Sequence, residues 1–91
     1  MSEARWRQGA DVAARRLEDE VVLVNLQTNH IYSLNATGSR VWELLDVPRT
    51  RAEVVDALVT EFDVERPTIE RETDELLASL SDAQLIASDG D

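Results

Sequence analysis

The sequence has no cysteine, no lysine, one histidine and three glycines. Without cysteine the chain can form no disulfide, no zinc ribbon, no iron–sulfur cluster and no thiol nucleophile. Its single histidine, His30, cannot by itself build a metal site or a Ser–His–Asp triad. Gly9, Gly38 and Gly90 make no phosphate-binding loop. We therefore expect no enzyme, no cofactor and no metal site, and the sequence favours a binding module.

The chain has 91 residues, which is enough for one domain with one core. It opens with no long apolar run, so we expect neither a signal peptide nor a membrane span, and a cytoplasmic location. Nine arginines face 19 acidic residues, for a net charge of −10. Because this charge repels phosphate groups, neither nucleic acid nor an anionic membrane is an expected partner.

The acidic excess lies in the second half of the sequence. Residues 1–42 carry five acidic and five basic residues, whereas residues 43–91 carry fourteen acidic residues and four arginines. The densest cluster consists of Glu70, Glu72, Asp74 and Glu75. Because these side chains lie at different angles around one predicted helix, we interpret them as a solvated helix face rather than as a cation site.

The first half of the sequence has the pattern of a three-stranded antiparallel meander. The predicted strands are residues 11–17, 21–26 and 30–34, joined by polar connections of turn length. We expect residues 10–87 to form the domain, and residues 1–9 and 88–91 to be mobile ends.

The second half predicts three helices. Asn35 can cap the first, and Thr50 with Glu53 has the spacing of a capping box at the start of the second. Pro67 suits the first position of the third helix. The apolar stripe of that helix consists of Ile69, Thr73, Leu76, Leu77, Leu80 and Ala83. Three strands followed by three helices predict a compact α+β domain with a winged helix-turn-helix-like arrangement.

The last predicted strand leaves an open sheet edge, on which an extended peptide can add as a further strand. If the third helix lies beside this strand, the two form a groove, with Ile31 and Ser33 on its strand wall. The predicted peptide-binding residues are His30, Ile31, Tyr32, Ser33, Leu34, Glu70, Thr73, Asp74, Leu77, Ala78 and Ser81. An apolar floor with an acidic rim suits a peptide that carries hydrophobic anchors and some basic residues.

Several segments follow one another in a characteristic order. They are residues 31–38 (Ile-Tyr-Ser-Leu-Asn-Ala-Thr-Gly), residues 41–46 (Val-Trp-Glu-Leu-Leu-Asp), residues 49–58 (Arg-Thr-x-x-Glu-Val-Val-x-x-Leu), residues 76–80 (Leu-Leu-Ala-Ser-Leu) and residues 85–86 (Leu-Ile). This ordered set resembles the PqqD family over nearly the whole predicted domain. Two positions differ, because the family commonly has a glycine where this chain has Gln84 and an aspartate where it has Glu72.

The resemblance implies a function. PqqD-like domains are recognition elements that bind the leader segment of ribosomally made, post-translationally modified peptides and present the precursor to modifying enzymes. In the family the leader adds as a strand beside the third strand and packs against the third helix. For this chain we expect a stand-alone version of the lasso-peptide type, a monomer or weak dimer whose partners are the precursor peptide, a leader peptidase and another modifying enzyme such as a cyclase.

Other functions fit parts of the pattern. A peptide chaperone of PQQ-type biosynthesis and a generic protein–protein adaptor both remain open. A DNA-binding winged helix has the same topology, but its third helix would set four acidic residues and only Arg71 against phosphates. A carrier protein is also small and acidic, but carrier domains are four-helix bundles, and the strand pattern of the first half is inconsistent with one.

Overall fold

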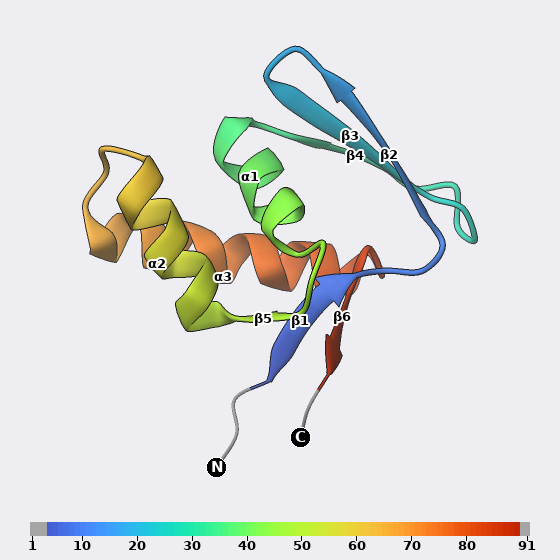
Figure 1. Cartoon of the computed structure of the whole chain (residues 1–91). Coiled ribbons are helices and arrows are strands. Elements are labelled where there is room, and N and C mark those ends of the chain that lie inside the picture. The colour runs from blue at the N-terminus through green and yellow to red at the C-terminus, as the bar shows by residue number, and fades with distance from the viewer. Residues whose placement is uncertain (1–3, 90–91) are drawn as a thin grey trace.

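The computed structural model describes residues 4–89, which form two three-stranded antiparallel sheets and three helices (Figure 1). The elements in chain order are β1 (Arg5–Gln8), β2 (Val12–Leu17), β3 (Glu20–Asn25), β4 (Ile31–Leu34), α1 (Ala36–Leu44), β5 (Arg49–Thr50), α2 (Arg51–Glu61), α3 (Arg66–Asp82) and β6 (Ile86–Asp89). The predicted α+β fold, with its antiparallel meander and three following helices, is confirmed.

The first sheet is the predicted meander and has the strand order β2-β3-β4. Successive side chains of a strand point to opposite faces, so the sheet has an inner and an outer face. Val21, Leu23 and Leu34 are buried on the inner face, whereas Ile31 on the outer face is 65% exposed. Within residues 4–89, β4 pairs with β3 on one side and with no strand on the other, so it is the open edge that the sequence predicts.

The second sheet has the order β5-β1-β6 and differs from the sequence-based expectation. Mobile ends were expected at residues 1–9 and 88–91, but β1 and β6 pair with each other along their whole length. Trp6 on β1 packs half-buried against the hydrophobic core, which helps to hold the pair in place. The remaining parts of the predicted ends, residues 1–3 and 90–91, lie outside the described residues.

Both predicted N-caps are present. The Asn35 side chain accepts a hydrogen bond from the Gly38 N–H at 2.8 Å. Thr50 and Glu53 form both hydrogen bonds of the capping box, and the Thr50 N–H lowers the pKa of the Glu53 carboxyl. Helix α3 begins at Arg66, so Pro67 takes the second position rather than the first, still in the turn where a missing N–H costs no hydrogen bond.

The core lies between the three helices and the inner face of the first sheet. Helix α3 contributes a buried stripe of Ile69, Thr73, Leu77 and Leu80. Leu76 and Ala83, which the sequence pattern assigns to the same stripe, are only partly buried. In the part of the chain that the structure describes, no helix combines the length and apolar character that a membrane crossing needs.

The C-terminus of α3 ends in a Schellman motif, with Gln84 at the position where the resembled family commonly has glycine. The Leu85 N–H donates to the Leu80 carbonyl at 2.9 Å, and the Gln84 N–H donates to the Ser81 carbonyl at 3.0 Å. Gln84 has a φ of +60°, in the left-handed region where a Cβ is strained. The turn therefore has the backbone conformation that glycine adopts most easily, and Gln84 is strained in it.

We expect Gln84→Gly to stabilise the protein by about 0.5–1 kcal/mol. Glycine removes the strain of a Cβ at positive φ, and this gain exceeds the entropic cost of the more flexible unfolded chain. Urea denaturation followed by circular dichroism measures the change. Gln84→Ala is the matched control: it removes the same side chain but keeps the strained Cβ, so it should give no gain. Equal stabilities for the two variants would contradict the assignment of strain.

Candidate functional site

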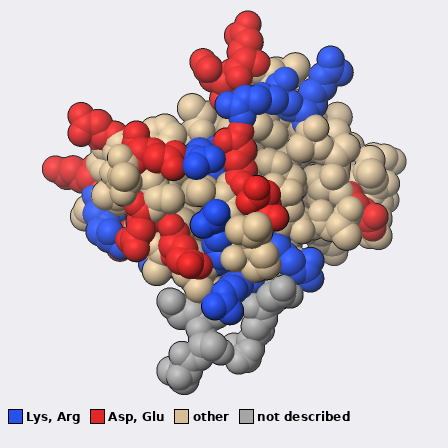
Figure 2. Space-filling view, viewed as in Figure 1, with Lys and Arg blue, Asp and Glu red and all other residues tan. Residues whose placement is uncertain are grey.

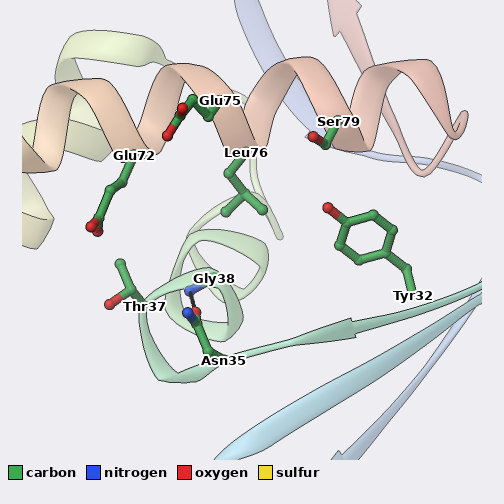
Figure 3. Close-up of a pocket in the computed structure, with 8 residues that line it drawn as sticks. All are labelled: Tyr32, Asn35, Thr37, Gly38, Glu72, Glu75, Leu76 and Ser79. Carbon is green, nitrogen blue, oxygen red and sulfur yellow. Dashed lines mark hydrogen bonds between the residues drawn. The ribbon is translucent and has the colours of Figure 1, made fainter.

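A groove runs between α3 and the outer edge of β4 and consists of two adjoining pockets. The first pocket, with a volume of about 330 Å³, lies between α3, the end of β4 and the start of α1 (Figure 3). It is lined by Tyr32, Asn35, Thr37, Gly38, Glu72, Glu75, Leu76 and Ser79. We call it the α1 pocket.

The second pocket, of about 800 Å³, continues the groove toward the turn between β3 and β4. It is lined by Thr28, Asn29, His30, Tyr32, Ser79, Asp82, Ala83 and Gln84. We call it the turn pocket. Tyr32 and Ser79 line both pockets, and Figure 3 shows the Tyr32 hydroxyl directed toward α3 near Ser79. These two residues therefore divide one continuous groove.

The backbone of β4 presents hydrogen-bonding groups to this groove. The Asn25 N–H donates to the His30 carbonyl at 2.9 Å, and this bond identifies which residues of β4 direct their backbone groups toward β3. Because residues of an antiparallel strand alternate in the side to which their backbone groups point, Tyr32 faces β3. Ile31 and Ser33 then direct their N–H and C=O groups to the open edge. An added strand would pair with these two residues.

The α1 end of the groove is fixed by the buried hydroxyl of Ser39. This hydroxyl accepts a hydrogen bond from the Val21 N–H at 2.9 Å and donates one to the Leu34 carbonyl at 3.2 Å. It thereby bridges the last pair of the β3–β4 ladder and attaches α1 to both strands. The α1 wall of the first pocket is held in place by this contact.

The opposite end is fixed by the side chain of Asn25, which is 3% exposed. Its amide nitrogen donates to the carbonyls of Ala83 and Gln84, at 3.0 and 3.3 Å. Its carbonyl oxygen accepts from the N–H groups of Gln27 and Thr28, at 2.9 and 3.2 Å. One side chain thus ties the β3–β4 turn to the end of α3.

The structure corrects the predicted strand wall. The side chain of Tyr32 lines the groove and that of Leu34 is buried beneath it, while His30 lines the turn pocket. Ile31 and Ser33, predicted as the strand wall, project their side chains from the outer face of the sheet and offer only backbone to the groove. The strand was predicted correctly, but its inner and outer faces were exchanged.

The predicted helix wall also needs correction. Glu70 and Asp74 pair with arginines outside the groove, and Ala78 does not line it. Thr73 and Leu77 are buried in the core, and Ser81 lines a separate cavity near β1 and β6. The wall is instead formed by the helix face of Glu72, Glu75, Leu76, Ser79, Asp82 and Ala83. A buried stripe has two flanks, and the sequence pattern alone does not say which one meets β4.

Two signals in the sequence indicate residues that the prediction missed. Leu76 belongs to the apolar stripe but lies at its margin, and such a half-buried apolar residue can mark a binding face. Asn25 is a polar residue near the end of the apolar run 21–26, where a buried amide needs hydrogen-bond partners. Neither signal identifies the partner element.

Charge is distributed unevenly around α3. Arg51 contacts Asp74 and lowers the pKa of that carboxyl, while Arg66 lies 3.4 Å from Glu70. No ion pair joins an arginine to Glu72 or Glu75 among the described residues, so the groove keeps an uncompensated negative charge. Figure 2 shows acidic side chains gathered mainly over the helical side of the molecule, a surface that would repel a phosphate backbone.

In residues 4–89, no group of histidine, aspartate and glutamate side chains is arranged to hold a metal ion. The four acidic residues that stand out in the sequence are instead divided between two faces of α3.

Comparison with known proteins relates this chain to one described family and to solved structures of the same fold. The model of the family described as coenzyme PQQ synthesis protein D (PqqD) matches residues 20–86. The structure of TbiB1 in complex with the TbiA(beta) leader peptide is similar with a TM-score of 0.82 and 38% identity, covering 93% of this chain and 99% of that one. Lasso peptide synthetase B1 complexed with the leader peptide shares the fold, with a TM-score of 0.77, 23% identity and coverage of 90% and 96%. No curated protein matches the chain.

We expect Asn25→Ala to lower the free energy of unfolding by about 2–4 kcal/mol, because it removes four hydrogen bonds and leaves partly buried backbone groups without these partners. Urea denaturation measures the loss. Gln27→Ala, which removes an exposed amide from the same turn, is the control and should change stability by no more than about 0.5 kcal/mol. Similar effects of the two variants would show that Asn25 is not the anchor of this turn.

Proposed function

The chain belongs to the PqqD family, and from this premise we propose that it binds the leader segment of a ribosomally made precursor peptide as an added strand on β4. The observation that carries the proposal is the open edge at Ile31 and Ser33, which lies beside a groove walled by α3. The complex of TbiB1 with the TbiA(beta) leader peptide, at 38% identity and nearly full coverage, supports the same kind of ligand for this chain.

In strand addition, backbone contacts supply affinity and side-chain contacts supply selectivity. The N–H and C=O groups of Ile31 and Ser33 pair with the peptide backbone and supply affinity that does not depend on its sequence. Alternate side chains of the peptide enter the groove, where the α1 pocket and the turn pocket select among them.

We further propose that the protein makes and breaks no bond itself. It holds the precursor for a leader peptidase and a cyclase of a lasso-peptide pathway, a choice supported by the fold that it shares with lasso peptide synthetase B1. A tethered precursor meets such an enzyme at an effective concentration of about millimolar, so binding alone accelerates processing.

The edge is tested by Ser33→Pro. Its outward N–H is lost and the proline ring occupies the path of an added strand, whereas the β3–β4 ladder keeps its hydrogen bonds. With the fluorescein-labelled TbiA(beta) leader peptide, and with peptides selected by mRNA display on the wild-type chain, fluorescence anisotropy should show a loss of affinity of about tenfold or more.

The matched control is Ala14→Pro on the other edge of the same sheet. The Leu26 N–H donates to the Asp11 carbonyl at 2.8 Å, and this phase places the Ala14 N–H on the outer side of β2. Ala14→Pro should bind the peptides as the wild type does. Unchanged binding by a folded Ser33→Pro would exclude strand addition at β4, and a wild-type chain that binds neither peptide would overturn the proposed function.

A further inference from the structure

The α1 pocket lies where one particular side chain of a bound strand must point. A strand paired with Ile31 and Ser33 sends the side chains opposite those two residues to the outer face. The side chain opposite Leu34 therefore lies on the groove face, at the end of β4 where the α1 pocket opens. Tyr32 separates this position from the turn pocket, so each pocket receives a different residue of the peptide.

The floor of the α1 pocket is apolar. Leu76 points from α3 toward Gly38 on α1, as Figure 3 shows. Gly38 completes the lining from α1, and a Cβ added there would lie 3.3 Å from Leu34 and Asn35 atoms, so a larger residue would crowd this end of the pocket. The partly buried Leu76 offers a surface on which an aliphatic chain can lie.

The rim of the same pocket is acidic and free to interact. Glu72 and Glu75 line it, and Figure 3 shows Glu72 reaching across toward Thr37. Two arginines near α3 are engaged elsewhere: Arg66 pairs with Asp56 and Glu70, and Arg51 with Asp74. Arg71 lies on α3 next to Glu72, but among residues 4–89 no ion pair joins it to either rim carboxylate. No described arginine neutralises the two rim carboxylates.

We propose that the α1 pocket receives an arginine or lysine of the bound peptide, at the position opposite Leu34. The aliphatic stem lies on Leu76, and the cationic head reaches the carboxylates of Glu72 and Glu75. This inference rests on the proposed function and adds to it the chemical class of one anchor residue in the peptide. A neutral apolar side chain would cover the same floor but leave both carboxylates without a partner.

Parallel selections test the residue class. A random peptide library displayed on mRNA is selected on the wild-type chain, on Glu72→Gln/Glu75→Gln and on Glu70→Gln/Asp74→Asn. The last variant is the matched control, because it removes the same two charges from the same helix but outside the groove. Wild type and control should enrich peptides with arginine or lysine at one fixed position, and the groove variant should lose that preference.

Affinities then measure the contact. For one enriched peptide and its Arg→Gln form, anisotropy should show that Glu72→Gln/Glu75→Gln weakens binding of the basic peptide by about five- to tenfold. The same substitutions should leave the Gln form nearly unaffected, which is the signature of a direct coupling in a double-mutant cycle. The preference for the basic peptide should also shrink as salt is raised.

Two outcomes would overturn the inference while leaving the proposed function intact. Wild-type selection could enrich peptides that depend on the β4 edge but carry no basic residue at any fixed position. Alternatively, the groove variant and the control variant could weaken binding of the basic peptide equally. The effect would then come from the overall charge of the protein and not from the α1 pocket. If instead the selection yields no peptide whose binding is lost in Ser33→Pro, the proposed function itself fails.

Discussion

The groove depends above all on the buried side chain of Asn25. Its amide donates to the carbonyls that end α3, and its oxygen accepts from the turn that begins the path to β4. A buried amide must satisfy both of its ends, so the helix terminus and the turn can occupy only a narrow range of relative positions. The distance between α3 and β4 at this end of the groove follows from that requirement.

Ser39 imposes the same kind of constraint at the other end. Its hydroxyl extends the β3–β4 ladder by standing between the Val21 N–H and the Leu34 carbonyl, and this contact brings the start of α1 against the strand. With both ends held by buried polar contacts, the groove exists before any peptide arrives. Binding then costs little reorganisation of the protein, and most of the entropic cost falls on the peptide.

How much of this the sequence could predict depends on how far apart the interacting residues are. The caps at Asn35 and Thr50 involve neighbours three residues away, and both were predicted correctly. The strand of Trp6 was missed because its partner strands, β5 and β6, come from distant parts of the chain. The groove wall was misplaced because the period of α3 locates its buried stripe, whereas the choice between Glu72 and Asp74 as the groove side depends on where β4 lies. A sequence pattern predicts contacts within one helix or strand, whereas packing decides which faces of different elements meet.

Strand addition alone cannot choose a partner, because every peptide backbone offers the same N–H and C=O groups to Ile31 and Ser33. Selection must therefore come from the groove, and the two faces of α3 differ in their charges. Asp74 and Glu70 on one face are matched by arginines of the same chain, whereas among residues 4–89 no ion pair reaches Glu72 or Glu75 on the groove face. An unmatched charge beside an apolar floor rejects acidic segments by repulsion and accepts cations, so it contributes more to specificity than to affinity. The net charge of −10 would attract any basic peptide at long range, whereas carboxylates at fixed places in the groove, such as Glu72 and Glu75, favour one alignment of the peptide along β4.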